Sequence, residues 1–317
     1  MTHALITLPT NQVISKPEDG DWKLLIEATL QTVAPSSARI YRRTFMAWAR
    51  WCEQHQADPL GLYANPVNTF LAEQSVSAPT RQRQLSALRK LARVLATLDF
   101  NTPARRAAYE SLLLLRAPKS DLPAPQERSR RALKPAEVDK VLRVWEGEQL
   151  RQKRNRALIA VLFLTGLRRA EAAALRWADI DLSEGILHVR HGKGDTSRDV
   201  ALAGDLAVEA LRVWQQAQGT DREFVFCPLL KGDRLGPDKP IITQAVYQVV
   251  QATAEQAGIV FSPHDARRTL ITEALTTGTP LADVQAQAGH RQESTTLRYA
   301  RPVAAKQRRE RLRLRYG

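Results

Sequence analysis

The sequence predicts a mainly α-helical protein with a small β-sheet, an α+β fold built from two domains. Apolar residues recur at helical spacing through most of the 317 residues, and prolines interrupt this pattern near the middle of the chain. Residues 185–202 instead alternate like two short strands. The length is sufficient for two domains with separate cores, and we expect them to span residues 21–116 and 132–300.

The composition favours a polyanionic partner. Lys and Arg number 47 against 33 Asp and Glu, which gives a net charge of +14. A basic surface gains affinity by releasing the counterions condensed on nucleic acid. Charge alone is equally compatible with a merely basic soluble protein.

Cysteine usage and hydropathy argue against several other classes of protein. The two cysteines, Cys52 and Cys227, cannot form a disulfide framework, and no Cys/His cluster has the spacing of zinc ligands. The most continuous apolar stretch, residues 157–167, is too short to span a bilayer, and the N-terminus lacks a signal pattern. We therefore expect a cytoplasmic protein without a structural metal.

The N-terminal domain is predicted to follow a flexible lead-in, residues 1–20, and to contain two basic amphipathic helices. The first, within residues 36–52, has one apolar face formed by Tyr41, Phe45, Trp48 and Cys52. The second, with Thr80 as its expected N-cap, buries Leu85, Leu88, Ala92 and Leu95. Basic residues on the other sides of these helices are candidate DNA contacts: Arg39, Arg42, Arg43, Arg81, Arg83 and Lys90. Ordinary solvated faces explain any one of these residues equally well.

A proline-containing basic segment, residues 117–131, is predicted to link the two domains. Pro118, Pro123 and Pro125 prevent a continuous helix there. Such a linker would let two basic domains lie on different faces of a DNA duplex. A segment that only connects the two domains explains the composition equally well.

The C-terminal domain is predicted to be helical around one β-hairpin. Helical periodicity resumes at residues 138–145, and a largely apolar helix over residues 155–164 ends at Thr165 and Gly166. The strands of the hairpin should cover residues 186–190 and 196–202. The rest of this half is again expected to be helical.

Two helix starts in this domain carry groups suited to a phosphate. Ser262 fits an N-cap with Pro263 and Asp265 completing a capping box, so His264 and Arg267 share the first turns of the helix. An imidazole and a guanidinium at a positive helix terminus can bind a phosphate. At the second start, Arg168 can donate two parallel hydrogen bonds to phosphate oxygens, and Glu171, one turn later, can fix its orientation.

Three further residues could complete a site that acts on a phosphodiester. Lys193 lies between Gly192 and Gly194 in the hairpin turn, where its ammonium could protonate a leaving oxygen. His290 follows a helix expected to end at Gly289, and Tyr299 comes nine residues later, after the expected start of another short helix. A tyrosine is an adequate nucleophile when a base or cation activates its phenol and the phosphate is neutralised.

The order of these motifs resembles the tyrosine recombinase, or phage integrase, family in its simple two-domain, Xer-like type. The motifs are Thr-Gly-Leu-Arg-x-x-Glu, Gly-Lys-Gly in a hairpin, His-x-x-Arg, Gly-His and a tyrosine nine residues later. The resemblance covers residues 132–301 and, more weakly, residues 22–116, which are similar to the family's helical core-binding domain. It implies a helical core-binding domain followed by a tyrosine recombinase catalytic domain.

The resemblance also implies a role for each of the six residues. Tyr299 would attack the scissile phosphate, form a 3′-phosphotyrosyl bond and release a 5′-hydroxyl. Arg168 and Arg267 would hold the nonbridging oxygens, Lys193 would protonate the leaving oxygen, His264 would serve as acid/base partner to the tyrosine, and His290 would bind the phosphate. Neither ATP nor a metal is needed, so no cofactor is expected. The family usually has Leu and His where this chain has Ala266 and Arg268.

The implied function is site-specific DNA recombination through a Holliday junction. The implied partner is double-stranded DNA at an inverted-repeat site, bound by a dimer per site and a tetramer in the synapse, on the nucleoid. The resemblance implies that the basic tail, residues 301–317, could form a subunit-exchange helix that docks on a neighbouring protomer, and contact with DNA explains its charge nearly as well. A type IB topoisomerase and a catalytically silent DNA-binding protein are the alternatives.

Overall fold

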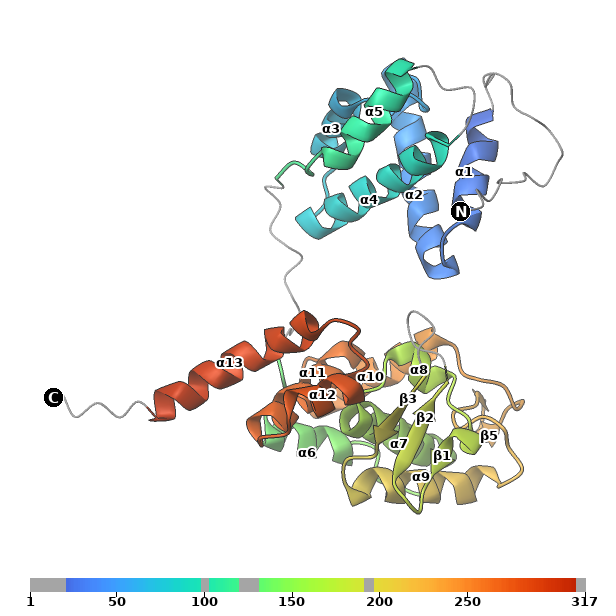
Figure 1. The fold of residues 1–317 in the computed structure, drawn as a ribbon. Coiled ribbons are helices and arrows are strands. Elements are labelled where there is room, and N and C mark those ends of the chain that lie inside the picture. The colour runs from blue at the N-terminus through green and yellow to red at the C-terminus, as the bar shows by residue number, and fades with distance from the viewer. Residues whose placement is uncertain (1–20, 98–102, 120–130, 191–196, 312–317) are drawn as a thin grey trace. The chain divides into compact units, whose positions relative to one another are not determined.

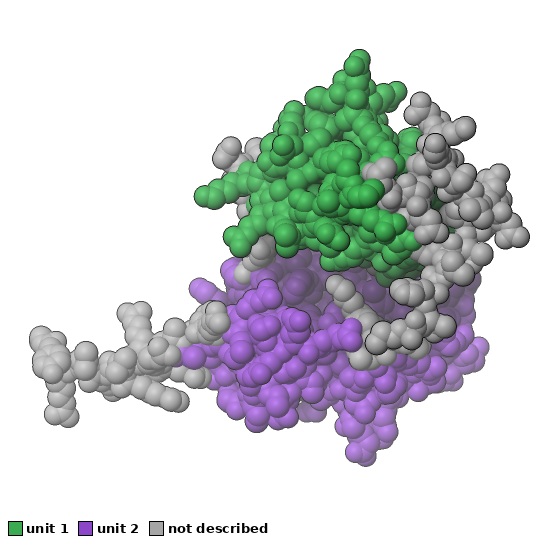
Figure 2. All heavy atoms as spheres, turned by 45° about the horizontal axis from the view of Figure 1, so that its top comes forward, with its two compact units in different colours: residues 1–127 green, residues 128–317 purple. Residues whose placement is uncertain are grey.

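The computed structural model describes residues 21–97, 103–119, 131–190 and 197–311, and the mainly helical fold with small antiparallel sheets is confirmed (Figure 1). The chain divides into two compact units, Met1–Glu127 and Arg128–Gly317, which Figure 2 colours separately. The predicted lead-in, most of the predicted linker and the glycine-flanked Lys193 lie outside the described residues. The predicted domain boundaries remain predictions.

The described part of the first unit is helical. Its helices are α1 (Asp21–Gln31), α2 (Pro35–Gln54), α3 (Ala64–Glu73), α4 (Ala78–Leu95) and α5 (Pro103–Leu114). The predicted apolar faces of α2 and α4 meet in one core, because Phe45, Trp48 and Leu88 are almost fully buried. The Trp48 ring stacks on Trp51 with centroids 5.3 Å apart, and its Nε1 donates to the Pro59 carbonyl (2.9 Å).

Two predictions for α4 are wrong. The helix begins at Ala78 with Ser77 as N-cap, so Thr80 lies inside its first turn. Arg81, a candidate DNA contact, is only 5% exposed. Its guanidinium donates to the carbonyls of Gln74 (3.0 Å), Pro118 (3.3 Å) and Lys119. It therefore connects the segment after α3 with the segment after α5 and does not face solvent.

The second unit packs its helices around α7. The helices are α6 (Pro135–Arg143), α7 (Leu150–Thr165), α8 (Arg169–Ala173), α9 (Asp205–Gln218), α10 (Thr243–Ala257), α11 (Pro263–Thr276), α12 (Leu281–Ala288) and α13 (Glu293–Arg311). Residues on almost every side of α7 are buried because α6, α8, α9, α10 and α11 all contact it. Helices α8 and α11, at whose starts three of the six predicted residues lie, both pack against this central helix.

The predicted hairpin is present and belongs to a three-stranded antiparallel sheet. Strand β2 (Ile186–Val189) pairs with β1 (Ile180–Asp181) on one side and with β3 (Arg198–Ala201) on the other. The register sets Val189 opposite Arg198. The sequence does not predict β1 or a second hairpin, β4 (Leu229–Leu230) with β5 (Arg234–Leu235), because two-residue strands leave no alternating pattern.

Two helix boundaries also differ from the predictions. Helix α7 begins at Leu150 and not near Asn155, because the carboxylate of Asp233, far away in the chain, accepts the backbone N–H of Leu150 (2.7 Å) and of Arg151 (2.9 Å). Helix α13 is not short, and it continues without a break past the predicted tail boundary at residue 300. Tyr299 therefore lies within a long helix.

Both cysteines have buried thiols. Burial, together with the charge of Asp58, raises the pKa of Cys52 to about 12. Burial, followed by a hydrogen bond to Asp238, raises the pKa of Cys227 to about 11. None of the helices that the structure describes is long and apolar enough to cross a membrane.

Candidate active site

The N-terminus of α11 presents His264 and Arg267, as the predicted capping box requires. The Ser262 backbone N–H donates to the Asp265 carboxylate (3.0 Å), and the Asp265 N–H donates to Ser262 Oγ (3.4 Å). With Pro263 in the first turn, this start is fixed by local bonds alone. His264 is exposed, whereas Arg267, one turn further on, is 4% exposed.

Arg168 is the N-cap of α8, and Glu171 holds it in place. The Glu171 carboxylate accepts both the Arg168 backbone N–H (2.8 Å) and its Nη1 (2.7 Å). The Glu171 side chain is 4% exposed. Burial alone would raise its pKa, but hydrogen bonds from Arg198 and Arg168 hold the pKa at about 2. The carboxylate is therefore ionised at neutral pH and holds Arg168 by two hydrogen bonds.

Arg198 is a member of this network that is absent from the sequence prediction. It begins β3, and its guanidinium donates to both Glu171 oxygens (3.1 and 2.9 Å). A signal is present in the strand alternation, because Arg198 shares its face of β3 with the buried Val200. A charged side chain on an inward face needs a buried partner of opposite charge.

Arg267 reaches the same region from α11. Its Nη1 donates to the Gly166 carbonyl (2.6 Å), and its Nη2 donates to the Ala288 carbonyl. Burial, followed by the charge of Arg168, lowers the pKa of Arg267 to about 10. Arg267 therefore keeps its charge at neutral pH, although it is almost completely enclosed.

Arg168, His264 and Arg267 line one cavity of about 340 Å³. Two other residues of its lining, Arg169 and Tyr247, are absent from the sequence prediction, and their side chains form a cation–π pair 6.0 Å apart. Neither residue carries a local motif that would have singled it out. Several arginines and a histidine in one lining make the cavity suitable for an anion.

His290 and Tyr299 lie against each other next to these arginines. Their rings stack with centroids 6.1 Å apart, and His290 Nδ1 hydrogen-bonds Thr296 Oγ1 (2.9 Å). Burial, followed by the charges of Arg267 and Arg168, lowers the pKa of His290 to about 4, so its imidazole is neutral at pH 7. The Arg268 guanidinium lies 5.9 Å from the centre of the Tyr299 ring.

The structure thus brings five of the six predicted residues into one region, whereas Lys193 lies outside the described residues, between the paired strands β2 and β3 in the sequence. Of the candidate DNA contacts in the first unit, Arg39, Arg42, Arg43 and Arg83 are exposed and Lys90 is partly exposed. Arg42 forms an ion pair with Glu27.

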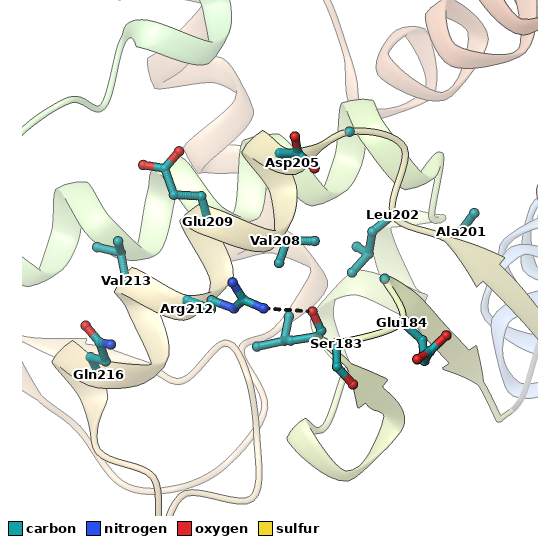
Figure 3. Close-up of a pocket in the computed structure, with 13 residues that line it drawn as sticks. Ser183, Glu184, Ala201, Leu202, Asp205, Val208, Glu209, Arg212, Val213 and Gln216 are labelled. Carbon is teal, nitrogen blue, oxygen red and sulfur yellow. Dashed lines mark hydrogen bonds between the residues drawn. The ribbon is translucent and has the colours of Figure 1, made fainter.

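A larger cavity of about 720 Å³ lies elsewhere in the second unit, between the turn after β1 and helix α9 (Figure 3). None of the five predicted site residues that the structure describes lines it, and its charged lining consists of three carboxylates, Glu184, Asp205 and Glu209, and one guanidinium, Arg212. These carboxylates would repel a phosphate. The cavity with Arg168 and His264 is therefore the candidate active site.

Comparisons with known proteins agree with the fold. The model of the phage integrase family matches residues 131–306, more than half of the chain. Tyrosine recombinase XerC of Xanthomonas campestris pv. campestris is 29% identical over 293 residues, which are 86% of this chain and 84% of XerC. Tyrosine recombinase XerA of Thermococcus kodakarensis is 31% identical over 150 residues, 47% of this chain, and the match spans about half (51%) of that relative.

A solved structure with a similar fold is the XerH site-specific recombinase bound to palindromic difH substrate in a post-cleavage complex. Its TM-score is 0.66 at 17% sequence identity, and the match covers 91% of this chain and 83% of XerH. At this identity the likeness concerns the fold.

Proposed function

Because the chain belongs to the phage integrase family, we propose that it cleaves and rejoins DNA at a specific site through a covalent bond between Tyr299 and a 3′ phosphate. It is a tyrosine recombinase, an enzyme that acts on DNA. The observation that carries the assignment of residues is the convergence of Arg168, His264 and Arg267 on one cavity, with His290 and Tyr299 beside it.

Each side chain has a role that its surroundings support. The Tyr299 hydroxyl attacks the phosphate, whose nonbridging oxygens are neutralised by Arg168 and Arg267 as charge grows in the transition state. His264, exposed in the cavity wall, exchanges the phenolic proton. His290 uses Nδ1 for Thr296, so its Nε2 is the atom that would bind a phosphate oxygen.

The sequence motif supports a matching role for Lys193, which would protonate the departing 5′ oxygen. No part of this scheme needs ATP or a metal, because the phosphotyrosyl bond conserves the energy of the phosphodiester. Rejoining reverses the same steps with a 5′-hydroxyl of the partner strand.

We also propose the assembly and the DNA contacts. A dimer would bind an inverted-repeat site and two dimers would form a tetrameric synapse, an arrangement for which the palindromic substrate of XerH is an analogy. Of the candidate DNA contacts on α2 and α4, those that reach solvent would contact backbone phosphates: Arg39, Arg42, Arg43, Arg83 and Lys90. The reaction would take place on the nucleoid in the cytoplasm.

The direct test is capture of covalent protein–DNA adducts. The purified chain is incubated with fragmented duplex DNA and denatured with detergent, and the trapped fragments are sequenced to recover the site. We expect Tyr299→Phe to abolish the adduct while DNA binding stays nearly intact, since only the nucleophilic oxygen is removed. Tyr63→Phe, at an exposed tyrosine of the first unit, is the control and should match the wild type.

An undiminished adduct in Tyr299→Phe would refute the assignment of the nucleophile. Efficient relaxation of a supercoiled plasmid that lacks the recovered site would instead favour a topoisomerase. Adduct formation by the wild type on one recovered site, with strand exchange between two copies of it, is the expected result.

A further inference from the structure

Three arginines bind the last carbonyls of one helix. Arg198 Nε donates to the Gln287 carbonyl (3.3 Å), Arg267 Nη2 to the Ala288 carbonyl, and Arg168 Nη2 to the Gly289 carbonyl (2.9 Å). The final carbonyls of a helix lack partners within the helix and carry the negative end of its dipole, so cations are favoured there. The C-terminus of α12 is therefore a common support for side chains from β3, α11 and the start of α8.

Arg198 differs from the other two because both of its Nη atoms bind the same carboxylate. Its two Nη atoms bind the two oxygens of Glu171 in a forked arrangement that fixes the plane of the carboxylate. The Arg198 side chain is 11% exposed and that of Glu171 is 4% exposed, so water competes little for these bonds. The same carboxylate holds Arg168.

Gly289 makes room for this arrangement. A Cβ atom at position 289 would lie 2.8 Å from Arg198 Nε and 2.9 Å from its Cδ and Cζ, closer than such atoms approach in proteins. The residue also has a φ of +60°, which glycine adopts without strain. Gly289 thus ends α12 and leaves the space through which Arg198 passes.

We propose that Arg198 is a positioning residue for DNA cleavage. By binding Glu171 it fixes the carboxylate that holds the guanidinium of Arg168. Arg168 is thereby kept at the end of α12, the helix that leads into His290. The inference rests on the proposed function. Arg198 also begins the strand that follows Lys193 in the sequence. Arg198, which is not among the predicted six residues, thereby connects β3 with the start of α8 and the end of α12, next to Arg168 and His290.

Loss of the Arg198 guanidinium should slow cleavage far more than it weakens DNA binding. A displacement of about 1 Å of a catalytic group costs up to about 100-fold in rate. We expect Arg198→Ala to slow single-turnover adduct formation on the recovered site by about 10- to 100-fold. Arg198→Lys keeps the charge but cannot bind both Glu171 oxygens and the Gln287 carbonyl, so it should restore only part of the rate.

The matched control is Arg212→Ala. Arg212 also donates to a backbone carbonyl, that of Leu182 (3.1 Å), but in the lining of the other cavity, shown in Figure 3. This variant should cleave at the wild-type rate. If Arg198→Ala does not fold, Arg198→Lys carries the same comparison.

A double-variant cycle separates positioning from a general structural effect. In an Arg168→Ala background, adding Arg198→Ala should slow the residual cleavage much less than it slows the wild type, because its effect passes through Arg168. An equal slowing in both backgrounds, or wild-type cleavage by Arg198→Ala, would overturn the proposal.

A readout without DNA distinguishes failure of this inference from failure of the proposed function. Glu171 faces Arg198 from β3, Arg168 from its own helix start and Arg267 from α11. Arg198→Ala should reduce the loss of folding stability on acidification from pH 4.5 to pH 2, measured by urea unfolding. An unchanged acid dependence would refute the Arg198–Glu171 contact even if the wild type cuts no DNA.

Discussion

At the scale of single residues, hydrogen bonds to neighbouring groups fix the direction of the charged side chains in the candidate site. A guanidinium has five N–H donors, and Arg168 uses one for Glu171 and one for the Gly289 carbonyl. With its side chain 32% exposed, it can still present donors to the cavity. Its direction is thus set before any phosphate arrives, which is the preorganisation that charge stabilisation in a transition state requires.

Acid sensitivity should reveal how strongly Glu171 is held. Its pKa in the folded chain lies below the usual value, so the unfolded chain takes up the proton first as the pH falls. The stabilisation is complete above about pH 4.5 and disappears as the pH falls towards about 2, with a loss of about 3 kcal/mol. We expect Glu171→Gln, compared by urea unfolding at pH 6 and pH 3, to lose less stability on acidification than the wild type.

Glu184→Gln is the control for that experiment, since Glu184 is an exposed acid in the turn after β1. It should keep the acid dependence of the wild type. If Glu171→Gln also kept it, the carboxylate would not be the group that titrates.

Some single-residue roles are accessible from the sequence and others are not. The pairing of Arg168 with Glu171 is predictable because both residues stand within one helical turn. Arg198 contacts the same carboxylate across 27 residues of chain, and only a fold can show that proximity. Helical periodicity predicts that Arg81 lies on the surface. The prediction is wrong because periodicity carries no information about its hydrogen-bond partners, the carbonyls of Gln74, Pro118 and Lys119, which lie outside α4.

At the scale of elements, local capping signals place the functional groups. Ser262 and Asp265 define where α11 begins, and the positive φ of Gly166 and Gly289 ends α7 and α12. These three points lie next to Arg168, Arg267 and His290. All of them are predictable from short stretches of sequence, since a cap depends on residues a few positions apart.

Removal of the α11 cap should loosen the helix start that holds His264. Ser262→Ala removes the oxygen that accepts the Asp265 N–H, and such a loss costs about 1 kcal/mol. Chemical unfolding should show that decrease, and amide hydrogen exchange should increase in the first turn of α11. Ser77→Ala is the control, because the Ser77 side chain makes no cap hydrogen bond in α4. Equal effects of the two variants would contradict the role of the cap.

Helix α13 shows an element boundary that the sequence does not place correctly. The composition changes near residue 300, which favours a short helix around Tyr299 and a separate basic tail, or a second helix, after it. The backbone instead continues in one helix from Glu293 to Arg311, since charge does not interrupt helical hydrogen bonding. Tyr299 therefore shares a continuous helix with the basic segment that follows it.

At the scale of the whole molecule, the net charge of +14 should dominate nonspecific DNA binding. Each phosphate contact contributes about 0.9 to the slope of log affinity against log salt concentration. We expect Arg43→Ala, at an exposed position of α2, to reduce that slope by about 0.9 in fluorescence anisotropy titrations with a random duplex. Arg81→Ala should leave the slope unchanged and lower folding stability instead, because Arg81 is buried. A reduced slope for Arg81→Ala would contradict this distinction.

The buried thiols have a practical consequence for observing the molecule at work. Thiol-reactive dyes attack thiolates, and the only two cysteines of the chain, Cys52 and Cys227, are enclosed and have raised pKa values. The native chain therefore gives little background labelling at neutral pH. Dyes attached through Tyr63→Cys and Leu230→Cys, at exposed positions in different units, would report by energy transfer how the separation of the units changes when DNA is added.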